Sequence, residues 1–189
     1  MKKIISVFQR NYDGDRLIRN EVTPGAEWVL AGEGVATQKM DGSCCMIRNG
    51  AFFKRYEVKQ GKTPPLNFEA AGDVDAETGK QQGWVPVLNG PDDRWHNEAR
   101  GNSPDILPDG TYELIGPKVQ GNPEGCMIHQ LIAHSSPHLI LAEQPPRYFE
   151  GIREYLRPGN IEGIVFHHPD GRMAKVKTKD FGMKRTPKQ

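Results

Sequence analysis

Residues 37–43 have the sequence Thr-Gln-Lys-Met-Asp-Gly-Ser. They place the amine of Lys39 two positions before the carboxylate of Asp41, in a stretch that ends in glycine and serine. A lysine amine can act as a nucleophile and carry a covalent intermediate when its pKa is lowered. An ordinary polar turn after a strand has the same composition, so the segments that follow decide between covalent chemistry and a simple turn.

The composition predicts one domain rather than a fibrous or disordered chain. The chain has 189 residues, of which 36% are hydrophobic and 26% are charged. A chain of this length and composition can form a hydrophobic core within one domain, residues 1–189. Its 21 glycines and 15 prolines favour short strands and many turns over a helical bundle. The formal net charge of +1 excludes a polycation, so nucleic acid would be bound through a local basic patch.

Cysteine usage and hydropathy indicate a reducing compartment. The three cysteines, Cys44, Cys45 and Cys126, are odd in number and two are adjacent, which does not fit a disulfide framework. The apolar run near the N-terminus is too short for a signal peptide, and no stretch is long enough to span a membrane. We therefore expect a cytoplasmic protein that contacts no membrane.

Short strands and turns follow the lysine turn. Asn49-Gly50 predicts a hairpin between strands at 44–47 and 51–56, and the second strand carries Lys54 and Arg55. Residues 62–100 have little periodicity and predict a loop-rich excursion with one short strand. The remaining prediction is a helix at 145–156 and strands at 4–8, 17–22, 83–87, 111–116, 139–142, 161–166 and 173–179.

Two groups of residues have alternative interpretations. In the excursion, Trp84, Trp95 and His96 could stack on bases, but a role in tethering the excursion to the core is favoured. The spacings of five and four between His129, His134 and His138 allow a zinc site, although Pro137 argues against a shared helical face.

Acidic and basic residues recur on the later strands. Glu113 lies in the apolar strand 111–116, where a carboxylate is costly unless it meets a cation, a metal or a hydroxyl group. Lys175, Lys177 and Lys179 alternate onto one face of strand 173–179, which by itself fits a solvated edge. A hairpin with strand 161–166 would bring Glu162 to these lysines, where they could bind phosphates.

Taken in order, the motifs are Lys-x-Asp-Gly, a basic strand, Tyr-Glu-Leu, Glu-Gly-Ile-Val and Lys-Val-Lys. This series resembles that of the covalent nucleotidyltransferases, which comprise ATP-dependent ligases and mRNA capping enzymes. The closer resemblance is to the small single-domain RNA ligases that join 5′-phosphate to 3′-hydroxyl ends. It is carried by residues 39–45, 83–87, 113–116, 121–123, 161–165 and 175–177.

The resemblance implies an α+β, ligase-type adenylyltransferase fold. Two mostly antiparallel sheets would be flanked by few helices, with a nucleotide cleft between the sheets. Only twelve residues follow Lys177, so no C-terminal OB domain is expected. The protein would act as a monomer on RNA with 5′-phosphate and 3′-hydroxyl ends, in RNA repair.

The resemblance also implies a reaction in three steps. Lys39 would attack the α-phosphate of ATP, AMP would pass to the RNA 5′-phosphate, and the 3′-hydroxyl would displace AMP. Lys39, Lys175 and Lys177 are the implied catalytic residues, the last two holding phosphates and stabilising charge. A free lysine has a pKa of about 10.4, so a neutral amine near pH 7.5 needs a shift of roughly 2 to 3 units, about 3–4 kcal/mol. Burial and neighbouring cations favour such a shift.

Further roles follow from the same resemblance. Glu162 would bind Mg²⁺ (or Mn²⁺) or a metal-bound water rather than the amine, and Glu113 would lie at the ribose or near the metal. Arg55 would contact ribose or an RNA phosphate, and Asp41 would orient Lys39. The implied ATP-binding residues are Thr37, Gln38, Lys39, Arg55, Glu113, Glu162, Lys175 and Lys177, and the implied metal ligands are Glu162, Asp41 and Glu113.

Three alternatives stay open. Thr37 stands where many DNA ligases have a glutamate that reads adenine, so this position does not define the nucleobase. The first alternative is a DNA ligase or guanylyltransferase of the same fold. A non-catalytic nucleic-acid-binding relative is the second, and a histidine metalloprotein is the third.

Overall fold

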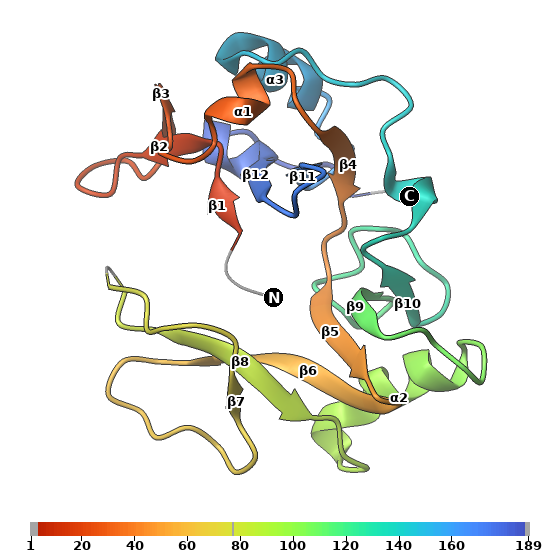
Figure 1. Ribbon diagram of the computed structural model, residues 1–189. Coiled ribbons are helices and arrows are strands. Elements are labelled where there is room, and N and C mark those ends of the chain that lie inside the picture. The colour runs from red at the N-terminus through yellow and green to blue at the C-terminus, as the bar shows by residue number, and fades with distance from the viewer. Residues whose placement is uncertain (1–3, 77, 188–189) are drawn as a thin grey trace. The chain divides into compact units, whose positions relative to one another are not determined.

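The structure is a computed structural model, which describes residues 4–76 and 78–187. These residues form two compact units (Figure 1). The four-stranded unit comprises residues 4–40 and 136–187, and the six-stranded unit comprises the described residues between 41 and 135. The chain passes from the first unit to the second between Met40 and Asp41, so the division falls inside the Lys-x-Asp-Gly motif.

The sheet of the four-stranded unit has the strand order β1-β12-β11-β4. Strand β1 runs parallel to β12, and the other neighbours are antiparallel. The unit contains the strands β1 (Ile5–Ser6), β4 (Val35–Lys39), β11 (Gly163–His167) and β12 (Met173–Lys177), the separate pair β2 (Phe8–Arg10) and β3 (Ile18–Val22), the α-helices α1 (Glu27–Leu30) and α3 (Phe149–Leu156), and the 3-10 helices η2 (Pro137–Leu139) and η3 (Thr178–Phe181).

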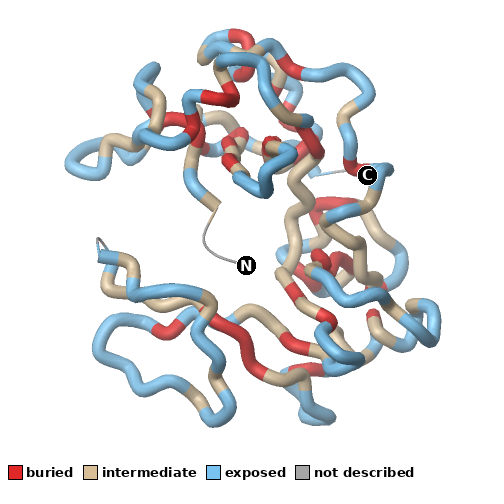
Figure 2. Tube along the Cα trace, viewed as in Figure 1, coloured by how far each residue is buried: buried red, intermediate tan, exposed pale blue. Residues whose placement is uncertain are grey.

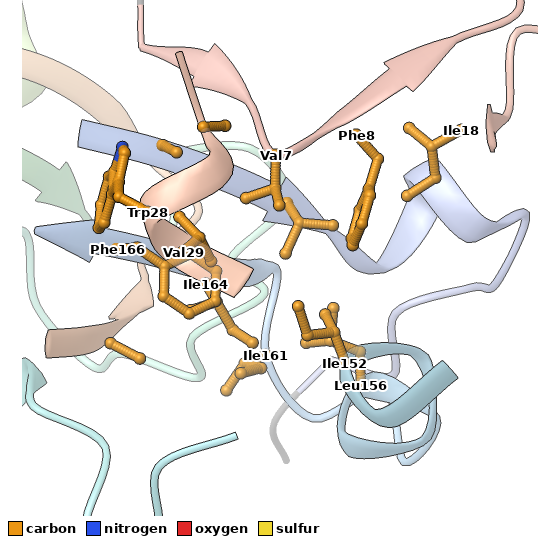
Figure 3. Close-up of a cluster of buried hydrophobic side chains, with 14 residues drawn as sticks. Val7, Phe8, Ile18, Trp28, Val29, Ile152, Leu156, Ile161, Ile164 and Phe166 are labelled. Atoms are coloured by element: carbon orange, nitrogen blue, oxygen red, sulfur yellow. The ribbon is translucent and has the colours of Figure 1, made fainter. Parts of the chain in front are cut away.

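An apolar core lies on one face of this sheet (Figure 3). Figure 2 shows how buried and exposed positions are distributed along the chain. Along β12, Ala174 and Val176 are buried, whereas Lys175 and Lys177 on the alternate positions are partly exposed. Because side chains alternate across a strand, packing of the apolar positions sends both lysines to the opposite face. The core side chains labelled in Figure 3 are Val7, Phe8, Ile18, Trp28, Val29, Ile152, Leu156, Ile161, Ile164 and Phe166.

The sheet of the six-stranded unit is antiparallel throughout, in the order β10-β9-β5-β6-β8-β7. The hairpin predicted at Asn49-Gly50 is confirmed, and φ is 51° at Asn49 and 73° at Gly50. This turn therefore uses two left-handed residues, as tight hairpins prefer. The elements are β5 (Ser43–Arg48), β6 (Ala51–Val58), β7 (Glu69–Ala70), β8 (Gln81–Pro86), β9 (Gly110–Ile115), β10 (Gln130–Ala133), the 3-10 helix η1 (Pro91–Asp93) and α2 (Arg94–Gly101).

The excursion at residues 62–100 has more regular structure than the sequence predicted. It contributes β7, β8, η1 and most of α2, and β8 joins the sheet beside β6. Trp84 is buried beneath the guanidinium of Arg55, whose central carbon lies 5.0 Å from the ring centroid. Trp95 stacks on His129 with a centroid separation of 4.7 Å. Both tryptophans thus pack within their own unit, as the tethering hypothesis predicted.

Three other boundaries differ from the prediction. Residues 139–142 do not form a strand; η2 ends there, and Ile140 makes only an isolated bridge to Thr37. Helix α3 begins at Phe149 rather than at 145, because the backbone of Tyr148 is still extended. Strand β12 ends at Lys177, so Lys179 is exposed on η3 and does not continue the lysine row.

The fold class was predicted correctly as α+β with mostly antiparallel sheets and few helices. The single functional domain and the nucleotide cleft between the sheets stay predictions. Among the described residues, no helix combines the length and the apolar character that a membrane crossing requires.

Candidate functional site

Four of the predicted residues share one face of the four-stranded sheet. Gly163 of β11 pairs with Lys39 of β4 on one side and with Lys177 of β12 on the other. Two residues further on, Val165 pairs in the same way with Thr37 and Lys175. Residues directly opposite one another on adjacent strands point to the same face. The register therefore places Thr37, Lys39, Lys175 and Lys177 on the face opposite the apolar core.

Glu162 joins two of these lysines. Its Oε2 accepts a hydrogen bond from Lys39 Nζ at 2.5 Å, and its Oε1 accepts one from Lys177 Nζ at 2.6 Å. The side chains of Lys39, Glu162 and Lys177 are only 20%, 11% and 21% exposed. We call Lys39, Glu162, Lys175 and Lys177 the lysine cluster.

Gly163 explains why the motif is Glu-Gly. A Cβ atom at this position would lie 2.2 Å from the carbonyl oxygen of Val176 and 2.8 Å from the Cα of Lys177. Only glycine lets β12 approach this closely. The close approach holds Glu162, the preceding residue, between the lysines of β4 and β12.

The expectation that Glu162 stays away from the Lys39 amine is wrong. Glu162 directly precedes β11 and accepts hydrogen bonds from both Lys39 and Lys177, and a buried carboxylate is stable only when cations or donors satisfy it. Burial raises the pKa of Glu162, but the ammonium groups of Lys39 and Lys177 outweigh burial, so the pKa lies below its ordinary value. Glu162 is therefore an anion at neutral pH.

The surroundings of Lys175 disfavour its charged form, whereas those of Glu162 favour its charged form. Burial, together with the ammonium groups of Lys177 and Lys39, lowers the pKa of Lys175 from 10.5 to about 8. Between these two pH values the unfolded chain binds more protons at this residue than the folded chain does. The contribution of Lys175 to the free energy of unfolding thus rises with pH across that window.

We expect the Lys175 amine to become reactive toward acetylation with a midpoint near pH 8, because it loses its proton there. Mass spectrometry of peptides after brief acetylation across a pH series measures this midpoint. In the Lys177→Met variant one neighbouring cation is gone, so the midpoint should move upward. A midpoint near 10.5 in the unaltered protein would contradict the environment described for Lys175.

The side chains of Thr37 and Gln38 lie on opposite faces of the four-stranded sheet. The Thr37 hydroxyl is 3.1 Å from the carbonyl oxygen of Val165, to which it donates, and 3.0 Å from Nε2 of His167. Gln38 pairs with Ile164, a core residue, so its side chain lies on the other face of the sheet. The structure therefore brings Thr37, but not the Gln38 side chain, to the face of the lysine cluster.

Sequence reasoning missed His167 and Asp180. His167 follows Gly163 and Val165 at a period of two, and this alternation is the signal that could have placed it on the same face. Asp180 Oδ2 accepts a hydrogen bond from the backbone N–H of Lys177 at 2.9 Å, and Asp180 also forms an ion pair with Arg10. Asp180 thus fixes the end of β12 through a contact with the backbone three residues earlier.

Arg55, Glu113 and Asp41 lie in the six-stranded unit. Arg55 lies over Trp84 and donates from Nε to the side chain of Gln82 at 3.2 Å. The Asp41 N–H donates to Glu124 Oε1 at 3.1 Å. The contacts of Arg55 orient its guanidinium within its unit, and the roles that the resemblance implies for Arg55, Glu113 and Asp41 stay predictions.

Close packing also requires glycine at Gly42, the last residue of the Lys-x-Asp-Gly motif. A Cβ atom on Gly42 would lie 2.1 Å from the carbonyl oxygen of Leu114 in β9. Because no side chain fits there, glycine allows the chain to enter β5 directly beside β9.

The three histidines do not act together. Nδ1 of His129 lies 2.8 Å from Glu98, and its Nε2 accepts a hydrogen bond from the backbone N–H of Lys118. His138 belongs to the four-stranded unit. In the part of the chain that the structure describes, the potential metal ligands that converge are His134, Cys44 and Glu113. Of the three histidines, only His134 belongs to this group.

Comparison with known proteins supports the resemblance seen in the motifs. The sequence profile of a family described as RNA ligase 1 matches residues 103–189, which include Glu113, Glu162, Lys175 and Lys177 but not Lys39. The chain is 25% identical to RNA ligase 1 of Rattus norvegicus over 223 aligned residues, covering 79% of this chain and 67% of that protein. The RNA ligase 1 proteins of Danio rerio and Mus musculus are 25% and 24% identical with the same coverage. The resemblance to RNA ligases is therefore confirmed at the level of sequence similarity.

Proposed function

We propose that this protein is an ATP-dependent RNA ligase that joins 5′-phosphate and 3′-hydroxyl ends through a lysyl-AMP intermediate on Lys39. The observation that carries the proposal is the lysine cluster. In it, Lys39 Nζ lies 2.5 Å from one oxygen of the Glu162 carboxylate, and Lys177 Nζ lies 2.6 Å from the other. Three motifs far apart in the sequence supply these residues. The similarity to proteins named RNA ligase 1 adds RNA as the substrate class.

In the first step the neutral Lys39 amine would attack the α-phosphorus of ATP. A phosphorus–nitrogen bond forms, the bond to the bridging oxygen breaks, and pyrophosphate leaves. The AMP would then pass to the 5′-phosphate of RNA, releasing the amine. Attack by the RNA 3′-hydroxyl on that phosphate would form the phosphodiester and expel AMP.

The lysine cluster supports the first step in two ways. Glu162 fixes the position of Lys39 Nζ, which reduces the entropy lost in reaching the reactive geometry. The ammonium groups of Lys175 and Lys177 favour loss of the proton from the Lys39 amine and would attract the ATP phosphates. The anion of Glu162 works against deprotonation, so we infer that Glu162 turns toward Lys177 when phosphates arrive.

Mg²⁺ or Mn²⁺ is the expected metal, and the donors around Glu162 do not fit it. Both oxygens of Glu162 accept hydrogen bonds from ammonium groups, whereas Mg²⁺ requires several oxygen ligands in octahedral geometry. Asp41 and Glu113 belong to the other unit. The cation would neutralise charge on the ATP phosphates themselves, and no step is assigned to a protein-bound metal.

The test is a ligation assay with nucleotide and nucleic acid varied separately. With ATP and Mg²⁺, a 5′-phosphorylated RNA strand should be joined to a 3′-hydroxyl RNA end and appear as a longer product on a denaturing gel. GTP in place of ATP, and nicked DNA in place of RNA, should give much less product. Preference for GTP would indicate a guanylyltransferase, and preference for DNA would indicate a DNA ligase. RNA binding with neither AMP transfer nor joining would indicate a non-catalytic relative.

A further inference from the structure

We propose a second site, a binding site for a divalent transition-metal ion such as Zn²⁺, formed by Cys44, Glu113 and His134 in the six-stranded unit. Ligand atoms from these three side chains all lie within 4.8 Å of one another. The proposed ligase activity assigns no function to Cys44 or His134. The proposal therefore goes beyond that activity and does not depend on it.

The strand register explains how the three side chains meet. Cys44 of β5 pairs directly with Glu113 of β9, so both side chains lie on the same face of the sheet. His134 directly follows β10, and its backbone N–H donates to the carbonyl oxygen of Thr111. Thr111 lies two positions before Glu113 and hence on the same face. Neighbouring strands thus deliver one ligand each to one place.

The apolar core defines the opposite face of this sheet. Cys45 is completely buried and Tyr112 is 4% exposed, and these neighbours of Cys44 and Glu113 pair with each other across β5 and β9. The thiol of Cys44 therefore points away from the core of its unit. Adjacent cysteines thus have different roles: Cys45 packs in the core, and Cys44 lies with the other two ligands.

Burial and hydrogen bonding suit a metal centre. Glu113 is 7% exposed, and a carboxylate this buried needs a cation or a donor. Its Oε2 lies 2.9 Å from Nε2 of His134, and Nδ1 of His134 lies 2.9 Å from the hydroxyl oxygen of Thr111. With the ring proton on Nδ1 and donated to Thr111, Nε2 would present its lone pair to a metal ion. Such a contact to the second ring nitrogen is usual for histidine ligands.

The donor set selects the class of ion. A thiolate and an imidazole are soft or borderline ligands that suit Zn²⁺ or Co²⁺, whereas Mg²⁺ and Ca²⁺ prefer oxygen. The third ligand is a carboxylate, which also binds Zn²⁺. Three protein ligands with an open fourth position are typical of many zinc centres. Binding would release the thiol proton of Cys44 to solvent, so affinity should fall as the pH is lowered.

The test is titration of the full chain with Co²⁺ alone, followed by displacement with Zn²⁺, in the absence of ATP and RNA. A bound cobalt–thiolate pair gives near-ultraviolet charge-transfer absorption, which should appear at one equivalent and disappear when Zn²⁺ is added. Cys44→Ser should remove this absorption, and His134→Ala should weaken binding by more than about tenfold. Thr111→Val should weaken it less than either.

Cys126→Ser and His138→Ala are the matched controls, because neither residue belongs to the proposed ligand set, and both should bind Co²⁺ as the unaltered protein does. Circular dichroism of each metal-free variant shows whether it folds. If Cys44→Ser does not fold, the affinity of His134→Ala for Co²⁺ decides the test. The proposal is overturned if Co²⁺ produces no thiolate absorption, or if folded His134→Ala binds with unchanged affinity. Since no ATP is present, either result leaves the ligase proposal untouched.

Discussion

Lys39→Ala is expected to abolish transfer of AMP from ATP to the protein. The substitution removes the only atom that the account assigns as the nucleophile, and neither Lys175 nor Lys177 can replace it if both hold phosphates. The assay is incubation with ATP labelled at the α-phosphate, followed by denaturing electrophoresis. No detectable label should remain on the variant, and joining of RNA ends by ATP should be lost with it.

The loss should not come from unfolding. In Lys39→Ala, Glu162 keeps its hydrogen bond from Lys177 Nζ at 2.6 Å, so the carboxylate is not left without a cation. We therefore expect the variant to fold. Lys179→Ala is the matched control, because Lys179 is exposed and lies outside the cluster. It should label normally, and full labelling of Lys39→Ala would refute the assignment.

Glu162→Gln is expected to have the largest effect on stability. The substitution keeps the shape of the side chain but leaves Lys39, Lys175 and Lys177 without the anion between them. Removing one partner of a largely buried ion pair costs about 3–5 kcal/mol. Urea unfolding should show a loss of this order at neutral pH, and AMP labelling should fall because the amine is no longer held in position.

The pH dependence gives a second test of Glu162. Because its folded pKa lies below the ordinary value of 4.5, Glu162 stabilises the protein above that pH, and this contribution is lost as the pH falls through the folded pKa. The difference in unfolding free energy between Glu162→Gln and the unaltered protein should shrink in acid. Glu150→Gln, at an exposed helix position, should change stability by less than about 0.5 kcal/mol at either pH. Equal stability of Glu162→Gln and Glu150→Gln would contradict the account.

The sequence predicted that a hairpin brings Glu162 into the neighbourhood of Lys175 and Lys177, and the structure pairs the two strands in that way. The turn at Asp170-Gly171 and the alternation of strands 161–166 and 173–179 define a hairpin, and the hairpin register follows from which residues are apolar. Period-two patterns are local, which is why this part could be predicted from sequence.

Other features depend on contacts between distant segments. The sequence does not show that Gly163 sits opposite both Lys39 and Lys177, which is what places Glu162 on the amine. The ion pair between Asp180 and Arg10 joins residues 170 positions apart. The excursion lacked periodicity because β8 is buried along several consecutive positions, so its strand has no alternation to detect.

Peptide mapping of the protein after incubation with ATP and Mg²⁺ tests the assignment of Lys39 as the nucleophile. We expect one added AMP per chain, attached through a phosphorus–nitrogen bond to the peptide that contains Lys39. Fragmentation by mass spectrometry should assign it to that side chain. AMP on any other residue, or no AMP on a protein that still joins RNA ends, would contradict it.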